Sequence, residues 1–127
     1  MGLKEKQALA GLDFGWAEKR IAEYTGVTTR ISVQPETVAD DLDAIFMLDT
    51  KGAVSVANAI AKVCYNAIGK EAFGEKKVVS ILLINHKEAG VKKVVIQAGA
   101  LELHGSWGAA SDYLSEDEIK DAIENQL

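Results

Sequence analysis

Two residues of this chain, Glu102 and His104, have the types and the spacing for acid–base chemistry. They are two positions apart in a run that alternates apolar and polar residues, so on a β-strand both would lie on the same face. A carboxylate beside a histidine can orient the imidazole ring and raise its pKa, which suits a general acid or base. The same pair is frequent on solvated strands, where it forms only an incidental ion pair. Glu102 and His104 are therefore the catalytic candidates, and a solvated surface pair is the alternative.

The residues that follow His104 offer a second chemistry. Glycines on both sides of Ser106 and Trp107 predict a loop with unusual backbone angles. A nucleophile set of Ser106, His104 and Asp112 can be imagined, but the hydrolase signature G-x-S-x-G is missing around Ser106. We expect Trp107 instead to cap the open end of the core, or to anchor a partner.

No pattern in the sequence predicts a metal or a cofactor. The acidic run 40–43 matches no established cation motif and is typical of a solvated helix face. Residues 69–70, Gly-Lys, lack the rest of a phosphate-binding loop. Cys64 is the only cysteine, which excludes an internal disulfide, and its place on an apolar helix face predicts an inert core residue. His86 is expected at a strand end, exposed to solvent.

The candidate residues belong to the stretch from Val78 to Gly105, which predicts three consecutive strands. Residues 78–84 form a near-continuous apolar run, typical of a strand that is covered on both faces. Residues 91–97 and 100–104 are the next two strands, and Ala98-Gly99 joins them as a hairpin turn.

The register of this hairpin decides which side chains share a face. A two-residue or a four-residue loop pairs Gln97 with Ala100 and Lys93 with His104, whereas a three-residue loop mixes polar and apolar residues on both faces. We prefer the first register, because a slip of one residue would expose the whole apolar set. It collects an apolar face of Val94, Ile96, Leu101 and Leu103. The opposite side, with Trp107 added, is the predicted ligand or partner face: Lys93, Gln97, Glu102, His104 and Trp107.

The N-terminal half predicts helices around one strand. We extend a first helix from Lys4 across Gly11 and Gly15 to Tyr24, with residues 1–11 as a segment that could be flexible. Residues 28–33 are rich in β-branched side chains and predict a strand. Residues 38–48 fit a helix or a short strand, with the helix favoured, and residues 49–52 predict a turn.

Two further helices complete the chain. Residues 53–68 have a clean amphipathic face that Gly69 or Gly74 closes. Near the C-terminus, Ser115 and Glu118 have the spacing of a capping box, and the helix that follows has apolar residues up to the last position.

The element order α-β-(α)-α-β-β-β-α predicts a single α+β domain over residues 1–127. Since neighbouring strands are joined by short turns, we expect an antiparallel sheet of about four strands, with helices packed mainly on one face. The sequence leaves open what covers the second face: a ligand, another subunit, the first helix or water.

Charge and hydropathy narrow the partners. The chain has 19 acidic and 14 basic residues, a net charge of −5, and no basic run. This composition argues against nucleic acid and anionic membranes as partners. No apolar run reads as a membrane span, and the N-terminus lacks the apolar core of a signal peptide, so a cytoplasmic location is expected.

Two functions fit these observations. The first is a protein-binding or regulatory module that self-associates as a homodimer or binds another protein, of a size and class shared by bacterial immunity proteins and secretion chaperones. The missing catalytic motif and the acidic charge favour this module over an enzyme. The second is a small-molecule binder or small enzyme that uses the polar sheet face around His104. A dimer that buries this face favours the first, and an enclosed pocket containing His104 favours the second.

Overall fold

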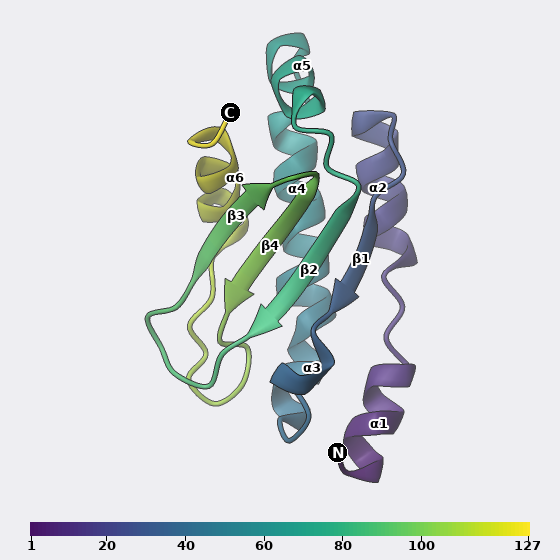
Figure 1. Cartoon of the computed structure of the whole chain (residues 1–127), viewed down its shortest axis with the longest axis vertical. Coiled ribbons are helices and arrows are strands. Elements are labelled where there is room, and N and C mark those ends of the chain that lie inside the picture. The colour runs from purple at the N-terminus through teal and green to yellow at the C-terminus, as the bar shows by residue number, and fades with distance from the viewer.

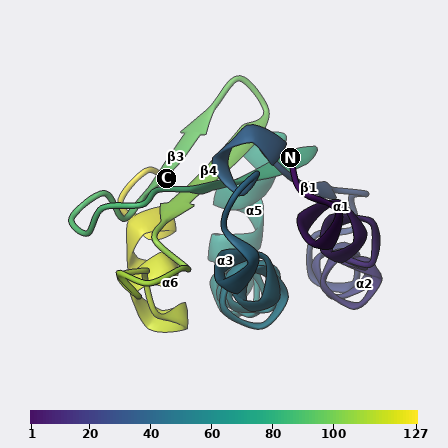
Figure 2. The same cartoon turned by 90° about the horizontal axis from the view of Figure 1, so that it is seen from below.

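The computed structural model describes residues 1–127 as a sheet of four strands with a layer of helices (Figure 1). The strands, in the spatial order β1-β2-β4-β3, are β1 (Arg30–Val33), β2 (Ser80–Asn85), β3 (Lys93–Gln97) and β4 (Ala100–Gly105). The helices are α1 (Leu3–Ala10), α2 (Gly15–Thr25), α3 (Leu42–Met47), α4 (Val54–Val63), α5 (Ala67–Glu75) and α6 (Glu116–Glu124). Seen end-on, the helices lie on one side of the sheet, as the sequence predicts, and no helix covers the other side (Figure 2).

The sheet is mixed and mostly parallel, so the expected antiparallel sheet is wrong. β1 pairs with β2 and β2 pairs with β4 in parallel, and only β3 and β4 are antiparallel. The chain returns from β1 to β2 through α3, α4 and α5, and such a crossover makes the two strands parallel. The short connection after β2 does not pair β2 with β3, because β4 lies between them. This order buries Leu101 and Leu103 of β4 in the core and leaves exposed Lys93 and Gln97 on the edge strand.

The hairpin register predicted from the sequence is confirmed. Gln97 pairs with Ala100, and the ladder continues to Lys93 opposite His104. Ala98 and Gly99 have φ angles of 51° and 79°, so both central residues of the turn are left-handed. Two positive φ angles define the type I′ turn, whose twist matches that of the flanking strands.

The core lies between the sheet and one long helical stretch, Leu42–Val63, that comprises α3, a π-helical segment Leu48–Ala53, and α4. The helix predicted within 38–48 is confirmed, but the turn predicted at 49–52 is wrong. There the helix widens instead, and the carbonyl of Lys51 accepts a hydrogen bond from the indole N–H of Trp107 at 3.2 Å. By length and composition this 22-residue stretch could span a membrane, contrary to the expectation from the sequence, although 56% of its apolar window is buried inside the domain. The buried share fits the core helix of a compact domain.

Two predicted helices are each divided. The first is interrupted between Ala10 and Gly15, where Asp13 accepts a hydrogen bond from the Gly15 N–H at 2.8 Å and starts α2. The second ends at Val63, and the side chain of Asn66 then caps α5. At both breaks a short polar side chain, Asp13 or Asn66, accepts a backbone N–H at the start of the next helix, and residues of weak helix propensity precede it. The capping box of Ser115 and Glu118 at the start of α6 is confirmed.

Candidate functional site

The side of the sheet that no helix covers, called the open face below, carries side chains whose places follow from the strand register. Residues paired across strands share a face, so the paired residues form rows that run across the sheet. The first row is Arg30, Ser80, Ala100 and Gln97, the second is Ser32, Leu82, Glu102 and Val95, and the third is Ile84, His104 and Lys93. Four residues of the predicted ligand or partner face are therefore together on this face: Lys93, Gln97, Glu102 and His104.

His104 is not the solvated surface histidine of the alternative interpretation. It is 9% exposed and lies between two hydrogen-bonding partners. Its Nε2 is 3.1 Å from Oε1 of Glu102, and its Nδ1 is 2.8 Å from Nε2 of His86. The two imidazole rings also stack, with centroids 5.1 Å apart and an angle of 24° between their planes. We call these three residues, Glu102, His104 and His86, the histidine relay.

The bonding pattern assigns the protons of the relay when both histidines are neutral. An ionised Glu102 can only accept, so Nε2 of His104 donates to it. The Nδ1 of His104 then carries a lone pair and accepts the N–H of His86 Nε2. The Nδ1 of His86 is consequently the free end of the chain, with a lone pair that is available to a proton or a ligand. In this arrangement the carboxylate and His104 orient His86, as a general base is usually oriented.

Electrostatics favours the neutral form of His86. Burial is the largest cause that lowers the pKa of His86, coulombic repulsion by the neighbouring His104 and by Lys93 lowers it further, and Glu88 acts in the opposite direction. At neutral pH the ring is therefore uncharged, which keeps its Nδ1 a proton acceptor.

The other residues singled out in the sequence lie elsewhere or have structural roles. Trp107 is 2% exposed and is not on the open face. Its ring stacks near Tyr113 with centroids 6.3 Å apart, so it caps the end of the core, one of its two expected roles. The set of Ser106, His104 and Asp112 does not assemble. The carboxylate of Asp112 binds the Gly90 N–H and Lys92, and the Ser106 hydroxyl is buried without a hydrogen-bond partner.

The acidic run and the cysteine also have structural places. Asp41 caps α3 through the Ala44 N–H at 3.1 Å, and Asp40 forms an ion pair with Lys87 at 2.6 Å. Nowhere in the chain are three or more histidine, cysteine, aspartate or glutamate side chains grouped so as to hold a metal ion. Cys64 is buried, and this burial raises the pKa of its thiol, which fits an inert core residue.

His86 is the functional candidate that the sequence analysis missed, since it was expected to be an exposed residue at a strand end. It follows Asn85, the last residue of β2, and Asn85 pairs with Gly105 at the end of β4. His86 therefore lies beside the end of β4. That neighbourhood exists only because β2 and β4 are parallel. The sequence does contain a signal, because each of the two histidines lies at the end of an apolar strand. To conclude that the histidines meet, however, one must know that β2 and β4 are neighbours in the sheet.

The open face has no enclosed pocket. Its one depression, of about 190 Å³, lies beside Glu102 and is lined by Val95, Gln97, Ala98, Ala100 and Glu102. His86 and His104 line none of the cavities in the molecule.

No family model, curated protein or solved structure matches this chain. Its function is therefore inferred from its own residues. The relay can exchange a proton and bind a polar group, but a substrate would need a second surface to enclose it.

Proposed function

We propose that this chain is a protein-interaction module that self-associates, with two copies packed through their open faces. The observation that carries this proposal is an uncovered sheet face with apolar side chains at its centre. Leu82 and Val95 are half-buried and Ile84 is 8% exposed, although no helix lies over them. Sheets bury such faces by packing against another layer about 10 Å away, and a second copy of the sheet supplies that layer.

The charges on the open face suit a second copy. Lys93 lies there with a single carboxylate, Glu102, while Arg30 at the β1 edge already pairs with Glu18 of α2, and the net charge of the chain is −5. In a two-fold symmetric dimer each copy presents the same patch, so Glu102 of each copy can face Lys93 of the other. The rest of the surface is acidic on each copy, so two copies repel each other when they meet through any other face.

The size of the open face sets the strength of the association. Four strands spaced about 4.8 Å apart and six residues of about 3.3 Å each give a face of roughly 19 by 20 Å. This flat area, roughly 400 Å², is below the ≈800 Å² that each partner buries in a standard interface. We therefore expect a concentration-dependent dimer whose dissociation constant is in the micromolar range or weaker, with the 86–92 connection adding contacts at the rim.

Sedimentation equilibrium between about 5 μM and 1 mM tests the proposal. The wild-type chain should show a monomer–dimer equilibrium, and Leu82→Glu should shift it to monomer by placing a charge in the centre of the open face. Phe46→Glu is the matched control, because Phe46 is a large apolar residue, 64% exposed, on α3 in the helical layer. A wild-type chain that stays monomeric at 1 mM contradicts the proposal, as does an equal loss of dimer in both variants.

The histidine relay favours a second candidate function, a small-ligand binder or small enzyme on the open face. His86 Nδ1 would accept a proton or a donor group of the ligand, with His104 and Glu102 orienting the ring. NMR titration of the imidazole signals with a panel of small amines, alcohols and carboxylic acids tests this function. A ligand that shifts both histidines, and that His104→Ala no longer binds, supports it. A panel without such a ligand at millimolar concentration counts against it.

We place the protein in the cytoplasm as part of this proposal. The support is its single cysteine, which is buried away from the surface and suits a compartment where thiols stay reduced. Fractionation of cells that express the untagged chain tests this location. Recovery with a membrane or secreted fraction would contradict it.

A further inference from the structure

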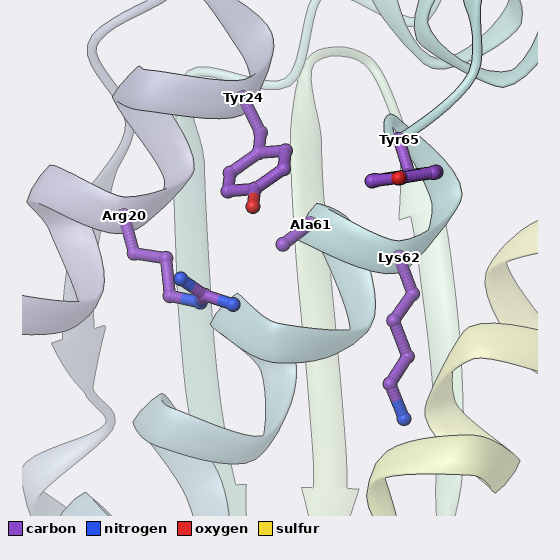
Figure 3. A pocket seen from close by; sticks show the side chains of 5 residues that line it. All are labelled: Arg20, Tyr24, Ala61, Lys62 and Tyr65. Atoms are coloured by element: carbon purple, nitrogen blue, oxygen red, sulfur yellow. The ribbon is translucent and has the colours of Figure 1, made fainter.

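A pocket on the helical side of the molecule has features of a binding site that are independent of the open face. It lies between α2 and α4, has a volume of about 290 Å³, and is lined by Arg20, Tyr24, Ala61, Lys62 and Tyr65 (Figure 3). This volume is just below the roughly 300 Å³ at which the range for sites of small organic ligands begins.

Arg20 is held in place from several directions. Its Nε donates to Oδ1 of Asn58 on α4 at 2.6 Å. The guanidinium carbon also lies 5.6 Å from the centre of the Trp16 ring and 5.2 Å from the centre of the Tyr24 ring, in the range of cation–π contacts. These contacts fix the plane of the guanidinium before any ligand arrives. Preorganisation of this kind lowers the entropy lost on binding.

The terminal nitrogens of Arg20 have no anionic partner. Arg20 forms no ion pair, whereas the chain's other arginine, Arg30, pairs with Glu18 at 3.6 Å. Glu23 lies with Arg20 around a neighbouring depression but makes no salt bridge to it. A guanidinium whose Nε is occupied and whose two terminal nitrogens are free can donate two parallel hydrogen bonds to a carboxylate.

The remaining walls of the pocket are aromatic and apolar. In Figure 3 the Tyr24 hydroxyl points into the space between Arg20 and Ala61, and the Tyr65 ring stands across the pocket. Tyr65 is 83% exposed, so an aromatic face is available there. The Lys62 amine points away toward α6, where it pairs with Glu116 at 3.2 Å and Asp117 at 2.9 Å. Arg20 is therefore the only unneutralised cation that lines the pocket.

We propose that this pocket binds a carboxylate attached to a flat, aromatic or apolar body. The two terminal nitrogens of Arg20 hold the carboxylate, with the Tyr24 hydroxyl as an additional donor. The body of the ligand packs on Ala61 and between the rings of Tyr24 and Tyr65. A free aromatic acid and an aromatic residue at the carboxyl end of a peptide share this chemistry. Asn58 is a positioning residue, since it acts only through Arg20.

NMR titration with benzoate tests the site, with benzamide as the neutral ligand of the same shape. Benzoate should shift the Nε–H signal of Arg20 and the ring signals of Tyr24 and Tyr65, and should bind at least tenfold more tightly than benzamide. Arg20→Gln should weaken benzoate binding at least tenfold. Lys70→Gln is the matched control, because Lys70 is an exposed lysine on α5 that does not line the pocket, and the affinity of this variant for benzoate should stay within about twofold of the wild type.

The remaining arms separate the two sources and keep the proposal refutable. A Gly-Gly-Phe peptide with a free carboxyl end is compared with its C-terminal amide. Binding of the free peptide but not of the amide indicates that a peptide terminus fits the site, whereas binding of benzoate without binding of either peptide indicates a free aromatic acid. Should Arg20→Gln fail to fold, Asn58→Ala replaces it, with weaker benzoate binding and a moved Arg20 Nε–H signal expected. Equal binding of benzoate and benzamide overturns the proposal. So does benzoate binding that Arg20→Gln leaves unchanged, or shifts confined to Lys93 and the histidines of the open face.

Discussion

Replacing His86 by glutamine should remove a pH dependence of stability that the histidine relay creates. Nε2 of His86 donates to Nδ1 of His104 over 2.8 Å, and an amide N–H of glutamine can make the same bond without titrating. In the wild type, a proton on His86 would add charge at a half-buried position beside His104 and Lys93, so burial first, and then repulsion by these neighbours, holds the pKa of His86 below its usual value.

The sign of the effect follows from proton binding in the two states. Above about pH 7.5 His86 is neutral in the folded and the unfolded chain, and it contributes no pH dependence. As the pH falls through about 6.5, the unfolded chain binds a proton that the folded chain still excludes, so the free energy of unfolding decreases. For a single proton the slope is at most about 1.4 kcal/mol per pH unit, and the loss ends once the pH is below the pKa of His86 in the folded state.

Urea denaturation of wild type and His86→Gln at pH 7.5, 6.5 and 5.5 measures this slope. The free energy of unfolding of the wild type should fall more steeply with decreasing pH than that of the variant. Carboxylates that begin to titrate near pH 5 are common to both chains, so they cancel in the difference. Lys93→Gln removes one of the charges that lower the pKa of His86, and its stability should depend on pH less steeply than that of the wild type. Parallel curves for wild type and His86→Gln would refute the relay as described.

Three further predictions concern packing and backbone. Trp107→Phe removes the hydrogen bond to the Lys51 carbonyl in a buried site, and urea denaturation should show a loss of about 1–3 kcal/mol in the free energy of unfolding, whereas an unchanged value would mean that water replaces the indole. Gly69→Ala places a Cβ against the carbonyl oxygen of Val63 and should lower the melting temperature. In the same helix, the Cβ of Gly74→Ala meets open space, so this variant should stabilise the chain by up to about 1 kcal/mol. Equal effects of the two variants on the melting temperature would contradict this contrast. The side chain of Gln126 accepts a hydrogen bond from the Ile96 N–H and donates one to the Val94 carbonyl, each at 2.9 Å. Deleting residues 124–127 removes both bonds, so the melting temperature should fall. An unchanged melting temperature would show that the C-terminal end does not stabilise β3.

The features that could be predicted from the sequence are those set by near neighbours. The hairpin of β3 and β4 follows from alternating residues and from a two-residue turn that accepts positive φ angles. The capping box of Ser115 and Glu118 likewise depends on residues three positions apart. The confirmed register also places four polar residues on one side of the sheet, as predicted: Lys93, Gln97, Glu102 and His104.

The features that were missed are decided by residues far apart along the chain. Nothing local to β2 reveals that β4, and not β3, is its neighbour, since both strands have apolar residues at the same alternate positions. Whether β3 or β4 takes the place beside β2 depends on which of them exposes less apolar area when it lies at the edge of the sheet. The two exposed areas can be compared only once the whole fold is known. The break at Gly11 and the π-helical segment at Leu48–Ala53 were missed for a related reason, since the hydrogen bond of Asp13 to the Gly15 N–H and the packing of Trp107 outweigh helix periodicity.

The strand order is also what creates the histidine relay. Parallel neighbours bring their carboxyl ends to the same edge of a sheet, which is where ligands bind in many sheets of this kind. His104 is near the end of β4 and His86 follows the end of β2, so the parallel pairing places the two rings side by side although they are 18 positions apart. In an antiparallel β2–β3–β4 meander, β3 would separate these strands, and His104 would keep only Glu102 as its neighbour on the same strand. The pair of residues visible in the sequence therefore gains its third member, and the fixed tautomers that come with it, from the mixed topology of the sheet.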